Sequence, residues 1–188
     1  MRLKPIGIIH SPFQHATGTP IQPRAAGGTE GAVQVFDEFV AGLKDLRGFG
    51  RIWLIYWFDR AIHRKCNLVV KPYLDDTPRG VFATRAPARP NPIGLSSVRL
   101  LEVRGNTLRV RDLDVLDGTP LLDIKPYFPQ FDSFRNVKSG WLRGSTLRGA
   151  NADDRFEKRK VKARRATIAT RPSASGRLAS RRRPGSKV

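Results

Sequence analysis

Ile52-Trp53-Leu54-Ile55-Tyr56-Trp57-Phe58 is the longest apolar run in this chain of 188 residues. Most of its seven residues are β-branched or aromatic, which favours a strand, and the run is too short for a typical helix. We therefore expect it to be a central strand of the fold. The run is also far short of the roughly 20 apolar residues that span a bilayer.

Shorter strand-like segments flank this run. Strands are predicted at residues 6–10, 32–35, 80–84 and 121–124, and a hairpin at 98–103 and 107–110. Phe36, Phe39, Val40 and Leu43 recur at the spacing of one helix face. Beyond Val110 the apolar residues shift from even to odd positions, which predicts a bulge near Asp112. The pattern indicates a mainly β fold, a single antiparallel β-barrel with one or two short helices.

Positive charge is concentrated at the C-terminal end. The chain has 35 Lys and Arg against 16 Asp and Glu, a net charge of +19, which favours an anionic partner, nucleic acid ahead of a membrane surface. Residues 151–188 hold 13 basic and three acidic residues and few large apolar ones. We therefore predict a barrel domain at 1–150 and a flexible basic tail at 151–188, with a transient helix over 156–168. The tail is either a phosphate-binding arm or a dispensable solvated extension.

Several classes of protein are excluded by what the sequence lacks. The single cysteine, Cys66, permits neither an internal disulfide nor a four-thiolate metal site, and the three histidines have no metal-ligand spacing. Residues 1–5 lack the apolar run of a secretory signal, so we expect a cytoplasmic protein without a membrane anchor. No dinucleotide-binding fingerprint follows Gly48-Phe49-Gly50, because Trp53 stands where the third glycine belongs.

Three loops carry more polar and proline residues than a connection between strands requires. They are residues 20–24, residues 83–94, and residues 117–120 with 123–127 just beyond. In Arg89-Pro90-Asn91-Pro92 the prolines fix the backbone and so pre-organise a guanidinium and an amide for binding. The alternative is an ordinary proline turn with a solvated arginine. Binding residues concentrate on loops held by a rigid scaffold, so we predict that the three loops meet at one pocket.

The order of the motifs carries a resemblance to a known family. They are Gly7-Ile8-Ile9-His10-Ser11-Pro12-Phe13, Gly18-Thr19-Pro20-Ile21-Gln22-Pro23-Arg24, Gly80-Val81-Phe82-Ala83-Thr84-Arg85, Arg89-Pro90-Asn91-Pro92-Ile93-Gly94, Leu116-Asp117-Gly118-Thr119-Pro120 and Asp123-Ile124-Lys125-Pro126-Tyr127. Together they resemble the TsaA-like family, also called the TrmO family, over about residues 3–130. The resemblance implies a single non-Rossmann β-barrel that binds S-adenosylmethionine.

The resemblance also implies an activity and a site. Well-understood bacterial members methylate N6 of threonylcarbamoyladenosine at position 37 of certain tRNAs, and they act as homodimers with the cofactor near the subunit boundary. By resemblance, the cofactor site of this chain comprises Pro20, Ile21, Gln22, Asp59, Arg60, Arg85, Arg89, Asn91, Ser97, Asp117, Gly118, Thr119 and Pro120.

The sequence departs from that family in two places. Well-studied bacterial members carry His-Gln where this chain has Asp59-Arg60, and they have a further C-terminal domain where this chain turns basic after about Gly149. No catalytic residue is assigned, because the polar candidates Asp117, Asp123 and Tyr127 fit structural roles better. The alternatives are a non-catalytic β-barrel that binds RNA or a small ligand, and a methyltransferase with a different acceptor.

Overall fold

The computed structural model describes residues 2–61, 66–144 and 150–156. Its strands are β1 (Gly7–His10), β2 (Glu30–Val35), β3 (Arg51–Trp57), β4 (Val69–Val70), β5 (Arg79–Gly80), β6 (Ile93–Arg104), β7 (Thr107–Arg111) and β8 (Thr119–Pro126). One four-residue α-helix, α1 (Pro129–Asp132), follows the last strand. The 3₁₀ turns are η1 (Pro23–Ala25), η2 (Asp37–Leu43), η3 (Leu46–Gly48), η4 (Asp59–Ala61), η5 (Val81–Ala83), η6 (Gly140–Leu142) and η7 (Asp154–Phe156).

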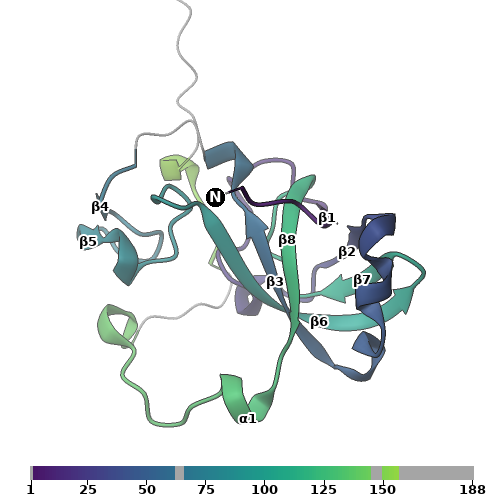
Figure 1. Ribbon diagram of the computed structural model, residues 1–188. Coiled ribbons are helices and arrows are strands. Elements are labelled where there is room, and N and C mark those ends of the chain that lie inside the picture. Colours follow the sequence, from purple (N-terminus) through teal and green to yellow (C-terminus); the bar gives the residue numbers. More distant parts are fainter. Residues whose placement is uncertain (1, 62–65, 145–149, 157–188) are drawn as a thin grey trace, which may run out of the picture. The chain divides into compact units, whose positions relative to one another are not determined.

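Six of these strands close into a barrel in the order β1-β2-β7-β6-β3-β8, and β8 pairs back with β1 (Figure 1). Every neighbouring pair is antiparallel. The apolar run seen in the sequence forms β3, which lies between β6 and β8. The predicted fold class, a single antiparallel β-barrel with few helices, is confirmed.

Alternation along each strand fills the barrel. Along β3, Ile52, Leu54 and Tyr56 are buried, while the residues between them are only half-buried, because successive side chains point to opposite faces. The closed sheet turns one of these faces inward, so the inward residues of all six strands meet in one core. The core comprises Ile9, Val33, Val35, Leu46, Ile52, Leu54, Tyr56, Val98, Val103, Leu108, Val110, Leu113, Val115 and Leu121.

Three local predictions need correction. The strand predicted at 80–84 is wrong: only Arg79–Gly80 is extended, and the chain then turns through η5, where the Thr84 hydroxyl donates to the carbonyl oxygen of Val81 at 2.9 Å. The helix over Phe36–Leu43 is a 3₁₀ helix, held by i→i+3 bonds. No bulge forms at Asp112, which follows the last residue of β7 and has a left-handed φ of 68°. The β6–β7 ladder is instead irregular between Leu100 and Glu102.

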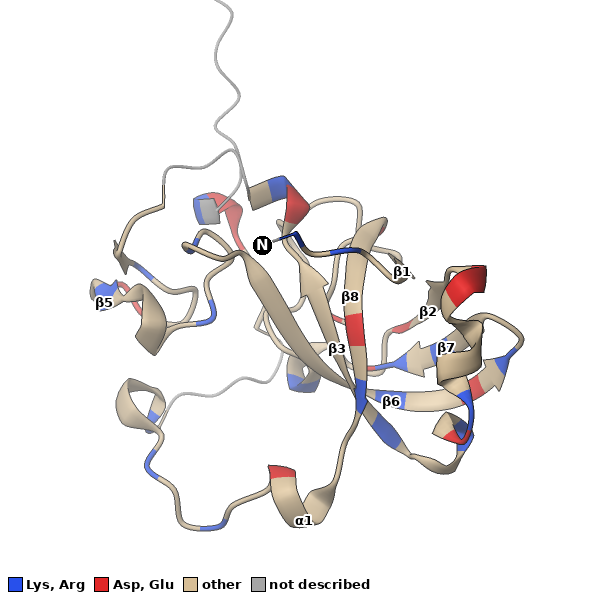
Figure 2. Ribbon diagram, viewed as in Figure 1, with Lys and Arg blue, Asp and Glu red and all other residues tan. Residues whose placement is uncertain are grey.

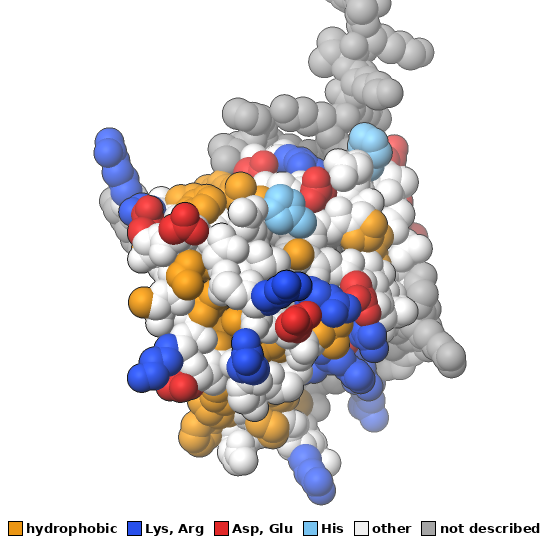
Figure 3. All heavy atoms as spheres, turned by 90° about the vertical axis from the view of Figure 1, so that its right-hand side faces the viewer, with side chains coloured by type: hydrophobic (Ala, Val, Ile, Leu, Met, Phe, Trp, Pro, Cys, Tyr) orange, Lys and Arg blue, Asp and Glu red, His pale blue; other side chains and the backbone are white. Residues whose placement is uncertain are grey.

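Charges on the barrel wall are largely paired. On the face with β2 and β7, acidic and basic side chains are interspersed (Figure 3), and Glu30 accepts from Arg109 at 3.2 Å and from Arg111 at 2.7 Å. Figure 2 shows both signs of charge along β6, basic residues on β7 and acidic residues at the start of η2. No helix in the described part of the chain is long and apolar enough to cross a membrane.

The predicted tail at 151–188 and its helix at 156–168 lie almost wholly outside the described residues. Its first residues pair with the barrel domain: Asn151 bridges to Pro20, and Ala152 exchanges 2.8 Å backbone hydrogen bonds with Gly18 and Thr19. Residues 150–156 therefore hold the first polar loop in place.

Candidate functional site: a pocket at one end of the barrel

The floor of the site is built where β3 faces β6. Tyr56 pairs with Gly94 across the two strands, and its ring packs edge-on against Phe58 at 5.3 Å between centroids. Gly94 has no side chain, so the Tyr56 ring lies directly over the β6 backbone. The absence of a side chain at Gly94 therefore makes room for the aromatic floor.

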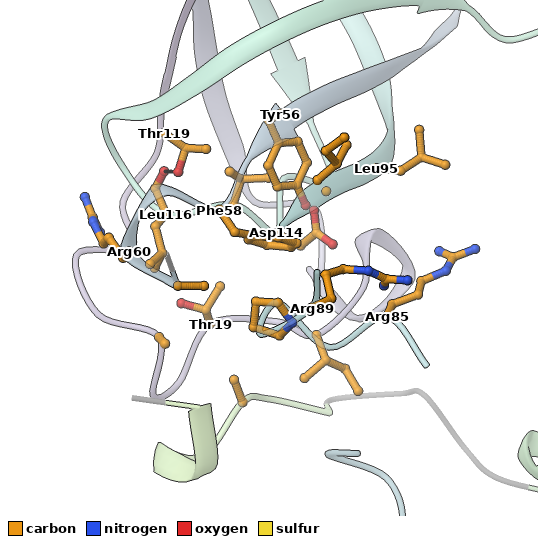
Figure 4. Close-up of a pocket in the computed structure, with 18 of the residues that line it drawn as sticks. Thr19, Tyr56, Phe58, Arg60, Arg85, Arg89, Leu95, Asp114, Leu116 and Thr119 are labelled. Atoms are coloured by element: carbon orange, nitrogen blue, oxygen red, sulfur yellow. Dashed lines mark hydrogen bonds between the residues drawn. The ribbon is translucent and has the colours of Figure 1, made fainter. Parts of the chain in front are cut away.

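A chain of buried polar groups continues from this floor. The Tyr56 hydroxyl is 3.0 Å from the Ser96 hydroxyl, which donates to a carboxylate oxygen of Asp114 at 2.6 Å. Burial raises the pKa of Asp114 to about 7, against smaller lowering effects of the Ser96 hydrogen bond and the Arg85 charge. Burial also raises the pKa of Tyr56, so this phenol keeps its proton at neutral pH. Asp114 points into the pocket beside Tyr56 (Figure 4).

The first loop forms one wall. The Thr19 hydroxyl donates to the carbonyl oxygen of His15 at 2.7 Å, which closes a turn before Pro20. Gln22 lies next along the wall, where its side-chain oxygen accepts from Arg85 at 2.5 Å. This bond joins the first loop to the second across 63 residues of sequence.

The second loop follows η5 and leads into β6. Arg89 folds back to donate to the carbonyl oxygen of Thr84 at 3.2 Å, and the carbonyl oxygen of Pro92 accepts from the backbone N–H of Phe58 at 2.7 Å. The prolines and these bonds hold the loop against the end of β3. Arg85 and Arg89 lie on the same side of the cavity in Figure 4.

The third loop lies between β7 and β8 and is tied to the end of β3. The guanidinium of Arg60 donates to the carbonyl oxygen of Asp117 at 2.5 Å and to that of Gln14 at 3.3 Å. The carboxylate of Asp117 accepts from the backbone N–H of Ser11 at 3.1 Å, and this bond is the largest cause of its lowered pKa. Gly118 turns the chain with a φ of 75°.

The three loops and the end of β3 enclose one cavity of about 1050 Å³. Nine of the thirteen residues predicted by resemblance line it: Pro20, Ile21, Gln22, Asp59, Arg60, Arg85, Arg89, Asn91 and Thr119. Asp117, Gly118 and Pro120 are not among the lining residues and belong to the third loop. Ser97 is not among the lining residues: it is the strand neighbour of Ser96, and its carbonyl oxygen accepts from Arg51 at 2.7 Å.

Several lining residues went unnoticed in the sequence. Tyr56, Phe58, Phe82, Leu95, Asp114 and Leu116 supply the aromatic and apolar surface and one carboxylate. Tyr56 and Leu95 sit inside strands, where the sequence pattern indicates packing alone. Asp114 is the polar residue between the buried Leu113 and Val115, and this alternation is the signal that could have identified it.

The surface of the cavity suits a ligand with an aromatic part and a charged part. Aromatic and aliphatic side chains form the floor, and three arginines stand at the rim (Figure 4). In the described residues, no three His, Cys, Asp or Glu side chains are grouped as metal ligands would be. Ligand pockets typically combine such apolar walls with a few placed polar groups.

Comparison with known proteins gives one consistent family. A protein of Pyrococcus abyssi named "Probable S-adenosyl-L-methionine-binding protein" is 57% identical over 155 residues, which cover 81% of this chain and 83% of the relative. The human "tRNA (adenine(37)-N6)-methyltransferase" is 35% identical over 139 residues, and the match covers 71% of this chain but only 32% of the human protein. The crystal structure of TrmO from Pseudomonas aeruginosa matches with a TM-score of 0.63 and 37% identity, covering 74% of this chain and 61% of that one.

The family model described as the tRNA-methyltransferase O N-terminal domain matches residues 8–133. This range holds all of β1 except Gly7, the strands β2 to β8 and all three loops of the pocket. The family resemblance predicted from the motifs is thereby confirmed. The relatives are named for S-adenosylmethionine binding and for methyl transfer to tRNA, which are the cofactor and the class of reaction that the resemblance implied. This chain belongs to the tRNA-methyltransferase O family, through its N-terminal domain.

Proposed function

We propose that this protein transfers a methyl group from S-adenosylmethionine to N6 of an adenosine in tRNA. The observation that carries the proposal is the convergence of three loops and the end of β3 on one cavity in a barrel of this family. The human relative is named for methyl transfer to N6 of adenine 37 of tRNA, and the Pyrococcus relative for binding S-adenosylmethionine.

The residues of the cavity fit S-adenosylmethionine. The volume of the cavity, about 1050 Å³, lies at the upper end of the roughly 300–1,000 Å³ typical of ligand pockets. This volume leaves room for an acceptor base beside the cofactor. Tyr56 and Phe58 offer an apolar surface to an adenine ring, and the guanidiniums of Arg85 and Arg89 suit a carboxylate. When bound, the cofactor supplies an activated methyl group on a sulfonium.

We assign cofactor binding to the nine predicted residues that line the cavity. Among them, Gln22 and Arg85 would act together, because their hydrogen bond joins two walls. Asp117, Gly118 and Pro120 would act by holding the third loop in shape rather than by contact. In the pair Asp59-Arg60, which stands in place of His-Gln, Arg60 would act by linking the end of β3 to the backbone of Gln14 and of Asp117 through hydrogen bonds.

The finer acceptor we propose is threonylcarbamoyladenosine at position 37, in the anticodon loop. A base in a single-stranded loop can be splayed out and stacked on an aromatic or guanidinium plane. Phe82 lines the cavity and is 76% exposed, so it offers such a plane at the entrance. We place the reaction in the cytoplasm, as expected from the sequence.

We also propose a homodimer that completes the cavity. Two large apolar lining side chains other than Phe82 are open to solvent, Ile93 at 39% and Leu95 at 44% exposure. Exposed apolar surface of this kind marks interaction sites. Size-exclusion chromatography with light scattering tests the proposal, and a mass of 21.0 kDa at micromolar concentration contradicts it.

Two measurements test the reaction. Calorimetry with S-adenosylmethionine should show binding, and the purified protein should transfer labelled methyl to tRNA from a strain that lacks the gene. Nucleoside mass spectrometry then locates the methyl group. A methyl group found at a different nucleoside would show that the proposed acceptor is wrong. Binding of tRNA without methyl transfer would favour a non-catalytic binding barrel instead.

A further inference from the structure

One carboxylate in the wall of the cavity, that of Asp114, is not assigned to cofactor binding. Asp114 lies between Leu113 and Val115, which are 0% and 3% exposed, so the barrel core fixes its backbone. Its side chain is part-buried and lines the cavity that Tyr56 and Leu95 also line (Figure 4). A carboxylate in such a place is costly unless function or a partner offsets the cost.

Hydrogen bonds orient this carboxylate from behind. The Ser96 hydroxyl donates its proton to Asp114 at 2.6 Å, so the Tyr56 hydroxyl, 3.0 Å from Ser96, must donate to Ser96 in turn. Tyr56 is 4% exposed and its ring packs against Phe58, so the hydroxyl groups of Tyr56 and Ser96 are held in place. One carboxylate oxygen is thereby held from behind, and the carboxylate stays accessible from the cavity.

Proton transfer is most efficient when the pKa of the base lies near the working pH. Burial raises the pKa of Asp114 to about 7, which meets this condition. Arg85 from the second loop is the charged group that acts on it, and it lowers this pKa, whereas Tyr56 from β3 faces it as a neutral phenol. His15, Asp59, Arg60 and Arg89 line the same cavity farther along its walls.

The other carboxylates and phenols considered from the sequence do not face the cavity. Asp117 binds Ser11 and Gln14, Asp123 pairs with Lys125 at 2.9 Å, and Tyr127 packs on Trp53 at 5.6 Å between centroids. None of the three is among the lining residues. Asp59 lines the cavity, but no hydrogen bond within the described residues holds its carboxylate as Ser96 holds that of Asp114.

We propose that Asp114 is the proton acceptor of the methyl transfer and that Ser96 and Tyr56 are its positioning residues; this inference rests on the function proposed above. In the step, the lone pair of the acceptor nitrogen forms the N–CH₃ bond as the S–CH₃ bond breaks, and the sulfur keeps that electron pair. The N–H proton passes to the carboxylate of Asp114, which releases it to water before the next turnover.

The test is the single-turnover rate of methyl transfer to tRNA, measured against pH with enzyme in excess. In the unaltered protein the rate should rise as the pH rises through about 7, as Asp114 loses its proton. Asp114→Asn should lower the rate by about 10²–10⁴-fold and abolish this rise, while the calorimetric Kd for S-adenosylmethionine stays within twofold. Asp114→Glu should recover part of the rate.

Asp112→Asn is the matched control. It removes a carboxylate two residues away, paired with Arg51 at 2.8 Å outside the cavity, and Asn tolerates the left-handed φ there. Its single-turnover rate and pH profile should equal those of the unaltered protein. Ser96→Ala should shift the rise to higher pH, because the Ser96 hydrogen bond lowers the pKa of Asp114.

Different failures lead to different conclusions. Loss of S-adenosylmethionine binding in a folded Asp114→Asn variant, or an unchanged rate, overturns the assignment of Asp114 and leaves the proposed function standing. An unaltered protein that methylates no tRNA rejects the function and this role together. If the Asn variant does not fold, the pH profile of the unaltered protein and a ¹³C NMR titration of its aspartate carboxyls decide: no midpoint near 7 in either overturns the proposal.

Discussion

Replacing Gly94 by alanine is expected to strain the floor of the cavity. A Cβ atom at this position would lie 2.7 Å from Cδ2 of Tyr56 and closer still to Cε2 and Cζ, below any normal contact distance. The ring cannot move away freely, because Phe58 packs against it and its hydroxyl is bonded to Ser96. The added methyl group therefore displaces the ring or the strand.

The magnitude follows from two opposing effects. Overpacking a close-packed site costs about 1–3 kcal/mol, whereas alanine in place of glycine gains about 0.4–1 kcal/mol by restricting the unfolded chain. Gly42→Ala is the matched control, since a Cβ atom added there would meet nothing within 4 Å and the φ of Gly42 is not positive. The difference between the two variants isolates the clash, at about 1–3 kcal/mol.

Thermal unfolding measures this difference. For a chain of this size 1 kcal/mol corresponds to roughly 2–4 °C, so Gly94→Ala should melt about 2–12 °C below Gly42→Ala. It should also lower the methyl-transfer rate, because a displaced Tyr56 leaves Ser96 without its donor. Equal melting temperatures for the two variants would show that Tyr56 is not confined by Gly94, and the account of the cavity floor would be wrong.

Three further outcomes are expected. As the pH rises from about 4 to 7, the unfolding free energy of the unaltered protein should fall relative to that of Asp114→Asn. The reason is that the raised pKa of Asp114 stabilises the folded state only while this carboxyl is protonated. Urea unfolding at a series of pH values measures this difference. Arg60→Ala should raise the calorimetric Kd for S-adenosylmethionine about fivefold by removing its hydrogen bonds to Gln14 and to Asp117 in the third loop. Deleting 157–188, which carries 12 basic residues and one acidic, should weaken tRNA binding and flatten its salt dependence without changing the Kd for S-adenosylmethionine. Deleting 150–188 should in addition raise the Kd for S-adenosylmethionine, because it removes the hydrogen bonds that hold the first loop.

Much of the fold was accessible from sequence because strand patterns are local. The apolar run at β3 and the 98–110 hairpin were both identified with the right type. The errors lie where tertiary context overrides the local pattern. Residues 80–84 read as a strand, yet Val81 is buried in a small cluster with Val70 and Ala86, and a 3₁₀ turn satisfies that packing.

Motif order also located most of the candidate site, since proline-rich polar loops are visible in a sequence. It did not reveal which face of a strand each residue occupies. Ser97 was predicted and Ser96 overlooked, although only Ser96 bonds to Asp114. A shift of one residue moves a strand side chain to the other face of the sheet, and register decides between such neighbours.

The sequence alone determined most of the barrel strands, the absence of a Rossmann fingerprint and the three proline-rich loops, since each depends on residues close together in the chain. Tertiary structure alone decided that Tyr56, Ser96 and Asp114 form one hydrogen-bonded chain. These residues lie on β3, on β6 and after β7, and the pairing of these neighbouring strands in the sheet brings them together. The elevated pKa of Asp114 has the same origin, because burial is a property of the assembled fold rather than of any single segment.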